Sequence, residues 1–426
     1  MSVDSHLATT TEHSLAQRFL QVRGLTDLLA SRLSAEDQTP QSMTAASPAK
    51  WHRAHVTWFF EEFVLRRDPA YTVYDDTYRY LFNSYYEAVG ERHPRHDRGL
   101  VTRPGVEDIT RYREYVDAAL SDRLRRGDLD DEALTLVELG CNHEQQHQEL
   151  LLMDIKHLFS TIPLSPGPIY VDREVDVDAG TPSLGWRSVG GGVVEIGVPG
   201  AGVPTAPFDG GFSYDNEGPR HRVFLEDFHI ADRPVTNADW LEFIADEGYR
   251  RPELWLSDGW AFCREQDLHA PGYWRLEDDG WTTFTLSGRR QVVGDEPVLH
   301  VSFYEADAFA RWAGARLPTE FEWETAATEL GDARGNLLDP DRCHPGRVGT
   351  AMIGDIWEWT SSAYLPYPGF VAANGAVGEY NGKFMCDQHV LRGASAVTPV
   401  GHERATYRNF FPASGRWLFG GLRLAR

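Results

Sequence analysis

The chain has 426 residues, too many for one ordinary domain, so two domains are expected. The formal net charge is −23, from 41 basic and 64 acidic residues, which argues against nucleic acid or an anionic membrane as a main partner because both bind basic surfaces. The N-terminus has no signal-peptide pattern, no apolar run could span a bilayer, and the four cysteines form no CxxC pair. We therefore expect a cytoplasmic protein without a disulfide framework or a zinc ribbon.

The first part of the chain has the apolar spacing of helices. Four segments show it, at residues 14–33, 47–66, 107–126 and 131–160. The stretch 68–105 between the second and third of them is irregular. Four helices of this length predict an antiparallel four-helix bundle, which we assign to a domain over residues 1–165.

The pattern changes after Phe159. Residues 166–185 are rich in Pro, Gly and Asp and lack helical periodicity, which is typical of a linker. Residues 186–426 contain short strand-like runs, many glycines and most of the tryptophans, and predict a second domain. The few helices expected there lie near 236–247, 303–314 and 319–329.

Two histidines share one face of the fourth predicted helix. His143 and His147 are four residues apart, and that face is otherwise apolar, with Leu136, Leu139 and Leu150. Two imidazoles inside a bundle core are costly unless their nitrogens are bound, and a metal ion binds them well. The alternative is a hydrogen-bonded pair of core histidines without a metal.

A third candidate ligand lies in the predicted helix at 47–66. His55 shares a face with Trp51 and Phe59, whereas His52 lies one step off that face. We therefore expect His55 to be the ligand and His52 to lie behind the ligands or at the surface. Three neutral histidines leave open positions on an octahedral ion. Iron(II) could hold a thiolate, dioxygen and one further substrate atom there.

The segment from His143 to His147 also matches H-E-x-x-H, the zinc-protease signature. In that chemistry Glu144 would be the general base and a third ligand would follow downstream. The pattern is short enough to arise by chance, and no other motif in the chain supports a protease.

Several phrases of the C-terminal part occur in the order found in one known fold. They are Asn216-Glu-Gly-Pro-Arg-His, Arg233-Pro-Val-Thr-Asn, Leu317-Pro-Thr-Glu-Phe, Gly354-Asp-Ile-Trp-Glu-Trp, Val390-Leu-Arg-Gly and Gly420-Gly-Leu-Arg. Over residues 186–426 the chain therefore resembles the formylglycine-generating-enzyme (sulfatase-modifying factor) family, whose fold is C-type-lectin-like. Oxidising members of that family use a cysteine pair that the stretch from Arg392 lacks, so formylglycine formation is not expected.

The N-terminal part, with WHRAHVTWFFE and HEQQHQEL, resembles the DinB-like iron-binding bundle. The two modules in this order resemble the ergothioneine sulfoxide synthases, and the similarity covers nearly the whole chain. The fold class implied is α+β, a DinB-like four-helix bundle followed by a C-type-lectin-like domain. The resemblance also implies an iron(II) centre that uses O2 to join a cysteine-type thiol to C2 of the imidazole of hercynine (trimethylhistidine), as a sulfoxide.

The resemblance assigns the metal ligands and one neighbour. His55, His143 and His147 match the iron ligands of the family. Gln146 matches a residue that approaches the substrate imidazole.

The substrate pockets are assigned in the same way. Asn409, Phe410 and Phe411 match residues that line the hercynine pocket, where aromatic faces attract a quaternary ammonium group. Arg95 and Arg98, in the motif His93-Pro-Arg-His-Asp-Arg, match arginines that bind the carboxylate of the thiol donor through forked hydrogen bonds. Without the resemblance, the two phenylalanines would indicate ordinary core and the two arginines a solvated loop.

A tyrosine near the iron is expected to act as a proton donor or reductant. The stretch Asn83-Ser-Tyr85-Tyr86 resembles the subgroup that takes free cysteine, so Tyr85 and Tyr86 are the candidates, with Tyr380 as an alternative. A γ-glutamylcysteine or selenosugar donor remains possible with the same centre. A lectin-like binding protein with structural histidines and a zinc hydrolase are the alternatives from other functional classes.

Overall fold

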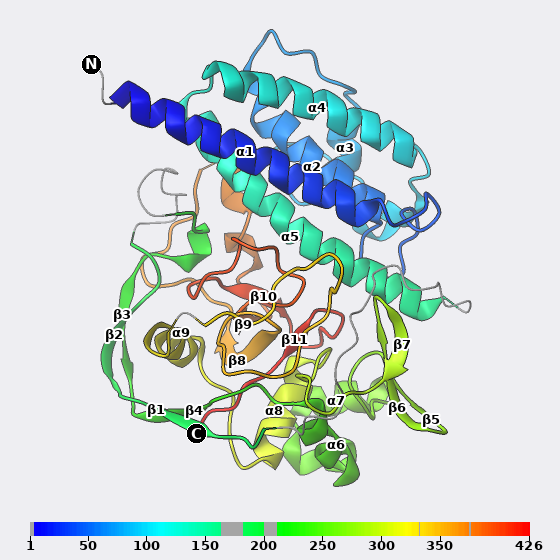
Figure 1. Ribbon diagram of the computed structural model, residues 1–426, viewed down its shortest axis with the longest axis vertical. Helices are drawn as coiled ribbons and strands as arrows, with labels where there is room; N and C mark the ends of the chain where they lie inside the picture. Colours follow the sequence, from blue (N-terminus) through cyan, green and yellow to red (C-terminus); the bar gives the residue numbers. More distant parts are fainter. Residues whose placement is uncertain (1–3, 163–181, 200–210, 332, 375) are drawn as a thin grey trace. The chain divides into compact units, whose positions relative to one another are not determined.

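A computed structural model describes residues 4–162, 182–199, 211–331, 333–374 and 376–426 (Figure 1). Most of the predicted linker at 166–185 lies outside these residues. The described chain forms two compact units. The first holds residues 4–162, 211–215 and 372–380, and the second holds the remaining described residues.

The first unit is built on four long helices. They are α1 (Asp4–Ala30), α2 (Ala49–Phe63), α4 (Val106–Arg126) and α5 (Asp131–Thr161). Each of α1 and α2 packs against both α4 and α5, which is the arrangement of a four-helix bundle (Figure 1). The segment predicted to be irregular contains only short helices, namely η1 (Leu65–Arg67), α3 (Tyr78–Phe82) and η2 (Arg95–Leu100).

Local sequence sets the ends of these helices. The side chain of Asp130 accepts a hydrogen bond from the backbone N–H of Ala133 and caps α5. Helix α4 ends at Gly127, whose φ of 63° lies in the left-handed region that glycine tolerates. Helix α2 begins directly after Pro48, inside the segment 47–66 that was predicted to be helical.

Helices α2 and α5 come close together one turn before the paired histidines. A Cβ atom on Gly140 of α5 would lie 2.4 Å from a ring carbon of Phe60 on α2. Glycine is therefore needed where the two helices approach, and this approach brings the histidine faces of α2 and α5 together.

The second unit contains four small sheets. The largest has the strand order β10-β9-β8-β11, in which β8 and β11 are parallel and the other pairs antiparallel. The strands of this sheet are β8 (Trp357–Ala363), β9 (Gln388–Arg392), β10 (Asn409–Pro412) and β11 (Gly420–Gly421). A three-stranded antiparallel sheet is formed by β5 (Trp274–Glu277), β6 (Gly280–Thr285) and β7 (Gly288–Gln291). The two remaining pairs are β1 (Trp186–Val189) with β4 (Phe228–Ala231), and β2 (Gly192–Ile196) with β3 (His221–Leu225).

The three helices expected in this unit are present as α6 (Asn237–Ala245), α8 (Phe303–Trp312) and α9 (Glu320–Glu329). Each begins with a capping box, at Thr236, Ser302 and Thr319. A further helix, α7 (Ser257–Glu265), was not predicted. It has nine residues, and unlike the other three helices of this unit it has no capping side chain at its start.

Buried ion pairs hold the core of the second unit. Glu320 binds Arg392 and Arg408, and Glu358 binds Arg423 and the indole N–H of Trp323. The four cysteines are free, and no described helix is long and apolar enough to cross a membrane. The predicted α+β fold class with an N-terminal helical region is confirmed.

Candidate metal centre

Two helices of the first unit bring three histidines together. His55 comes from α2, and His143 and His147 come from α5. One ring nitrogen from each lies within 4.8 Å of the others. These are the three residues predicted as ligands, and His52 is not among the clustered side chains.

The ring nitrogens have the orientation that a metal ion requires. Nδ1 of His55 is 2.6 Å from the carbonyl oxygen of Phe82, so it donates there and leaves the lone pair of Nε2 unused. Nε2 of His55 and both ring nitrogens of His143 are buried without a hydrogen-bond partner. Because buried polar atoms are almost always paired, these orphaned nitrogens point to an absent ligand.

Aromatic rings fix the orientation of the histidines. Trp51 and Trp58 stack on His55, with centroid distances of 4.6 and 5.6 Å. Phe59 packs against His143 at 4.8 Å. The ligand-bearing faces are therefore rigid before any ion binds.

Burial keeps the three imidazoles neutral. It lowers the pKa of His143 to about 3, and it lowers the pKa values of His55 and His147 well below 6.5, with the neighbouring imidazoles adding to the effect. Neutral imidazoles present lone pairs, and three of them without a carboxylate or thiolate fit iron, zinc or copper. The residues present therefore fit a divalent transition metal.

Glu144 does not face the histidines. Its carboxylate is fully buried and accepts hydrogen bonds from Arg23 at 2.9 Å, Arg113 at 3.2 Å and Thr26 at 2.6 Å. Burial raises the pKa of Glu144, but the charges of Arg23 and Arg113 outweigh it and the net shift is downward. A carboxylate held in this way is a structural anchor, and the geometry argues against the general base of a zinc hydrolase.

The three candidate tyrosines form one cluster beside His143. The ring of Tyr380 is 5.7 Å from that of His143 and 6.3 Å from that of Tyr85, and its hydroxyl donates to Oε1 of Gln146. The hydroxyls of Tyr85 and Tyr86 are 3.4 Å apart. Burial raises the pKa of each tyrosine, so all three are protonated at neutral pH.

A carboxylate ties the two tyrosine segments together. Glu379, the residue before Tyr380, accepts hydrogen bonds from the backbone N–H groups of Glu87 and Ala88 at 3.0 and 2.8 Å. Tyr214, which the sequence did not suggest, stacks on Tyr380 at 5.3 Å. Tyr214 lies far from the histidine motifs in the chain and just before the motif that begins at Asn216, so the sequence did not connect it with the site.

Arg98 is a buried cation near the histidines. It is 3% exposed, its guanidinium lies 3.4 Å from the ring centroid of Trp51, and Trp51 stacks on His55. It donates to the hydroxyls of Ser47 and Ser84, and no described carboxylate is ion-paired with it. Burial, followed by the charge of Arg95, lowers the pKa of Arg98, a cost that an anionic ligand would relieve.

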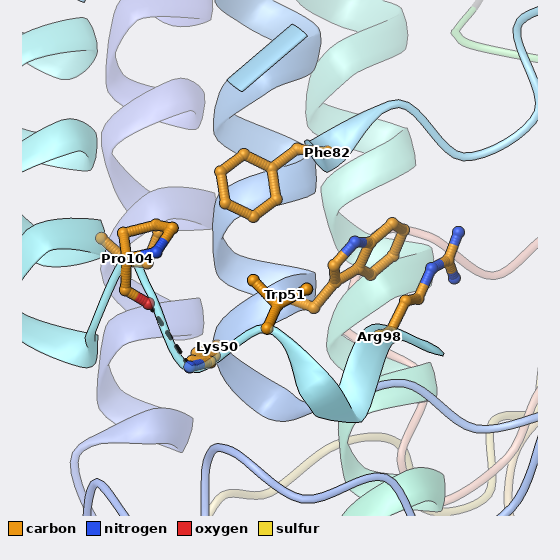
Figure 2. Close-up of a pocket in the computed structure, with 7 residues that line it drawn as sticks. Lys50, Trp51, Phe82, Arg98 and Pro104 are labelled. Atoms are coloured by element: carbon orange, nitrogen blue, oxygen red, sulfur yellow. Dashed lines mark hydrogen bonds between the residues drawn. The ribbon is translucent and has the colours of Figure 1, made fainter. Parts of the chain in front are cut away.

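Figure 2 shows Trp51 and Arg98 side by side at a small apolar pocket. Its lining is Lys50, Trp51, Phe82, Arg98, Val101, Pro104 and Ile109. Two of these lining residues are hydrogen-bonded to each other: Lys50 donates to the carbonyl oxygen of Pro104 at 3.3 Å (Figure 2).

The remaining predicted residues lie elsewhere. Arg95 is exposed and donates to the carbonyl oxygen of Ala45. Asn409, Phe410 and Phe411 belong to β10 of the second unit, where Phe410 stacks on Tyr364 at 4.1 Å. Their part in a substrate pocket stays a prediction.

Comparison with known proteins gives the class of the chain. Residues 186–341 and 344–426 match the model of the Sulfatase-modifying factor enzyme 1-like domain. A three-histidine helical bundle and a domain of this family together define a two-module protein.

Three relatives carry the same printed name, "Hercynine oxygenase". The protein of Mycolicibacterium smegmatis is 37% identical, with 67% of this chain and 70% of the relative covered. That of Mycolicibacterium thermoresistibile is 32% identical, covering 89% and 87%, and that of Mycobacterium tuberculosis is 38% identical, covering 50% and 56%. The chain belongs to the hercynine oxygenase family, which confirms the resemblance predicted from its motifs.

Proposed function

We propose that this chain is an iron(II)- and O2-dependent sulfoxide synthase of ergothioneine biosynthesis. It joins the sulfur of cysteine to C2 of the hercynine imidazole. The observation that carries the proposal is the cluster of three neutral histidines, in which His55 and His143 are buried and keep unpaired ring nitrogens, beside the buried Arg98. Iron(II) held by His55, His143 and His147 would supply the site at which O2 is activated.

The reaction balances without an external reductant. The S–H bond of the thiol and the C2–H bond of the imidazole break, and the C–S and S–O bonds form. The two organic substrates together lose four electrons, which reduce O2. One oxygen atom enters the sulfoxide and the other leaves as water.

Arg98 is the proposed anchor of the thiol donor. A carboxylate bound to its guanidinium would neutralise a buried cation, and Trp51 separates that guanidinium from His55. A small amino acid thiol bound at Arg98 is proposed to direct its sulfur toward the metal centre. Arg95 would add a second cation at the exposed side.

Gln146 and Tyr380 are the proposed contacts on the other side of the centre. The hydroxyl of Tyr380 donates a hydrogen bond to the side-chain carbonyl oxygen of Gln146. This hydrogen bond sets the orientation of the Gln146 amide. Burial keeps Tyr380 protonated, and Tyr380 is the proposed proton donor. Tyr85, whose ring contacts that of Tyr380, and Tyr86 are the other candidates. Asn409, Phe410 and Phe411 are proposed to bind the carboxylate and trimethylammonium groups of hercynine.

The decisive experiment is an anaerobic reconstitution with iron(II), followed by addition of O2, hercynine and one thiol. We expect stoichiometric O2 consumption and a product whose mass equals hercynine plus cysteine plus one oxygen minus two hydrogens. No O2 uptake with any low-molecular-weight thiol would contradict the proposal.

The same assay distinguishes the donors. Cysteine, γ-glutamylcysteine and a selenosugar compete in one mixture, and the product masses report the preference. A lectin-like binding protein would bind no stoichiometric iron and would form no product in this assay.

A further inference from the structure

His52 lies between a predicted metal ligand and a carboxylate. Its Nδ1 is 2.8 Å from Nδ1 of His147, and its Nε2 is 3.0 Å from Oδ2 of Asp154. His52 and Asp154 are 3% and 6% exposed, so water does not compete strongly for these hydrogen bonds.

Helix geometry produces this chain of contacts. Asp154 follows His147 by seven residues on α5, which is two turns, so both side chains lie on one face of the helix. His52 reaches across from α2. Oδ2 of Asp154 also accepts a hydrogen bond from the backbone N–H of Ser47, at 2.7 Å, just before α2 begins. The carboxylate is therefore fixed to the same end of α2 that carries His52.

The contacts allow one assignment of protons when His147 binds a metal. Its Nδ1 faces His52, so Nε2 is the nitrogen left for the metal. In the neutral ring the proton is then on Nδ1, which donates to Nδ1 of His52. His52 must carry its own proton on Nε2, where it donates to Asp154.

We propose that His52 and Asp154 are positioning residues for the metal centre, which hold His147 as an Nε2 ligand and transmit the charge of the Asp154 carboxylate to it. The inference rests on the proposed metal site. Ligating histidines commonly donate their second nitrogen to a carboxylate or carbonyl group, which raises their basicity. His55 uses the carbonyl oxygen of Phe82 for this purpose, whereas His147 uses a carboxylate through a second imidazole.

The first test is the titration of the metal-free protein with Co(II) under anaerobic conditions, with the visible absorption bands as the signal. We expect His52→Phe, which removes the acceptor, to weaken Co(II) binding by about 10- to 100-fold. His52→Gln keeps an acceptor oxygen for Nδ1 of His147 and should recover part of the affinity. Asp154→Asn should weaken binding by about 10-fold.

The second test is the reduction potential of the iron-loaded protein. Asp154→Asn should raise it, because the lost negative charge had favoured iron(III) over iron(II). The matched control is Asp117→Asn, which removes a carboxylate of the same bundle that pairs with Arg23 and touches none of the histidines. Asp117→Asn should lower the thermal unfolding midpoint and leave the Co(II) affinity and the potential unchanged.

The outcomes separate the inference from the proposed function. If the wild-type protein binds neither Co(II) nor iron(II), the proposed function fails. If it binds metal and forms product, but His52→Phe and Asp154→Asn keep wild-type Co(II) affinity and potential, the inference is overturned. The same holds if Asp117→Asn weakens Co(II) binding as much as Asp154→Asn does.

Discussion

Glu144 shows how a side chain inside a metal-binding motif can serve the fold. It lies between His143 and His147 in the sequence, yet the helix turns its carboxylate toward Arg23 and Arg113. Residues at i and i+4 share a face of a helix, and the residue at i+1 points about 100° away from them. The same geometry that pairs the histidines therefore removes Glu144 from them.

The first prediction is that Glu144→Ala destabilises the protein and spares the metal site. Arg23 and Arg113 would each lose one buried carboxylate but keep another, Asp117 and Asp27 respectively. We therefore expect a loss near the lower end of the roughly 3–5 kcal/mol that breaking a buried ion pair costs in the free energy of unfolding. Denaturant unfolding measures the loss, and Glu114→Ala, at an exposed position of α4, is the control. Folded Glu144→Ala protein without bound metal would contradict the assignment of Glu144 as a structural anchor.

The ring of Tyr380 lies 5.7 Å from that of His143, and its hydroxyl donates to Gln146. We predict that Tyr380→Phe lowers kcat by about 10²- to 10⁴-fold, the range for loss of a general acid, with unchanged iron affinity. Steady-state O2 consumption and iron titration check this. If Tyr85→Phe or Tyr86→Phe causes the larger loss of kcat, the proton donor is in the segment that the sequence favoured.

At the scale of elements, helix α9 is the anchor of the second unit. Its first residue, Glu320, binds Arg408 and also Arg392 of β9. Burial raises the pKa of Glu320, but the charges of the two arginines outweigh this effect. The pKa of Glu320 therefore lies below its usual value of 4.5. Because the folded state holds this carboxylate ionised, its contribution to stability is present above pH 4.5 and is lost as the pH falls further.

We therefore predict that stability falls below pH 4.5 and that Glu320→Gln makes the fall shallower. At pH 7 the same change should lower the free energy of unfolding by about 3–5 kcal/mol, because Arg408 and Arg392 remain buried. Denaturant unfolding at a series of pH values is the measurement. Glu329→Gln, at the exposed end of α9, should leave the pH profile unchanged. An identical pH profile for Glu320→Gln and the wild type would disprove the role of Glu320.

For the whole molecule, the two units should respond differently to metal removal. An ion that binds only the folded bundle adds about 4 kcal/mol of stability when its free concentration is 1,000 times its Kd. We predict that chelation lowers the unfolding temperature of the helical unit and leaves that of the second unit unchanged. Calorimetry with and without chelator, with tryptophan emission as a second probe, resolves the two transitions. Equal shifts in both transitions would contradict this prediction.

The sequence by itself determined the helices, the α+β class and the identity of the three clustered histidines. Helical periodicity and the spacing of ligands on one helix are local properties. They can therefore be recognised from residues that lie within two helical turns of one another. The motif order in residues 186–426 gave the family, which the comparisons confirm. Two short helices, α3 and α7, were not predicted, because five and nine residues give the apolar spacing of a helix little room to repeat.

Only the tertiary structure decided what surrounds the histidines. It brings Tyr380 and Tyr214 from distant segments to Gln146 and the tyrosine pair, and it places Arg98 over Trp51. It also directs His52 to His147 and Asp154, although His52 lay off the predicted ligand face. These contacts join residues that are far apart in the chain. They depend on how the helices and loops pack, and the spacing of residues within one short segment does not reveal that packing.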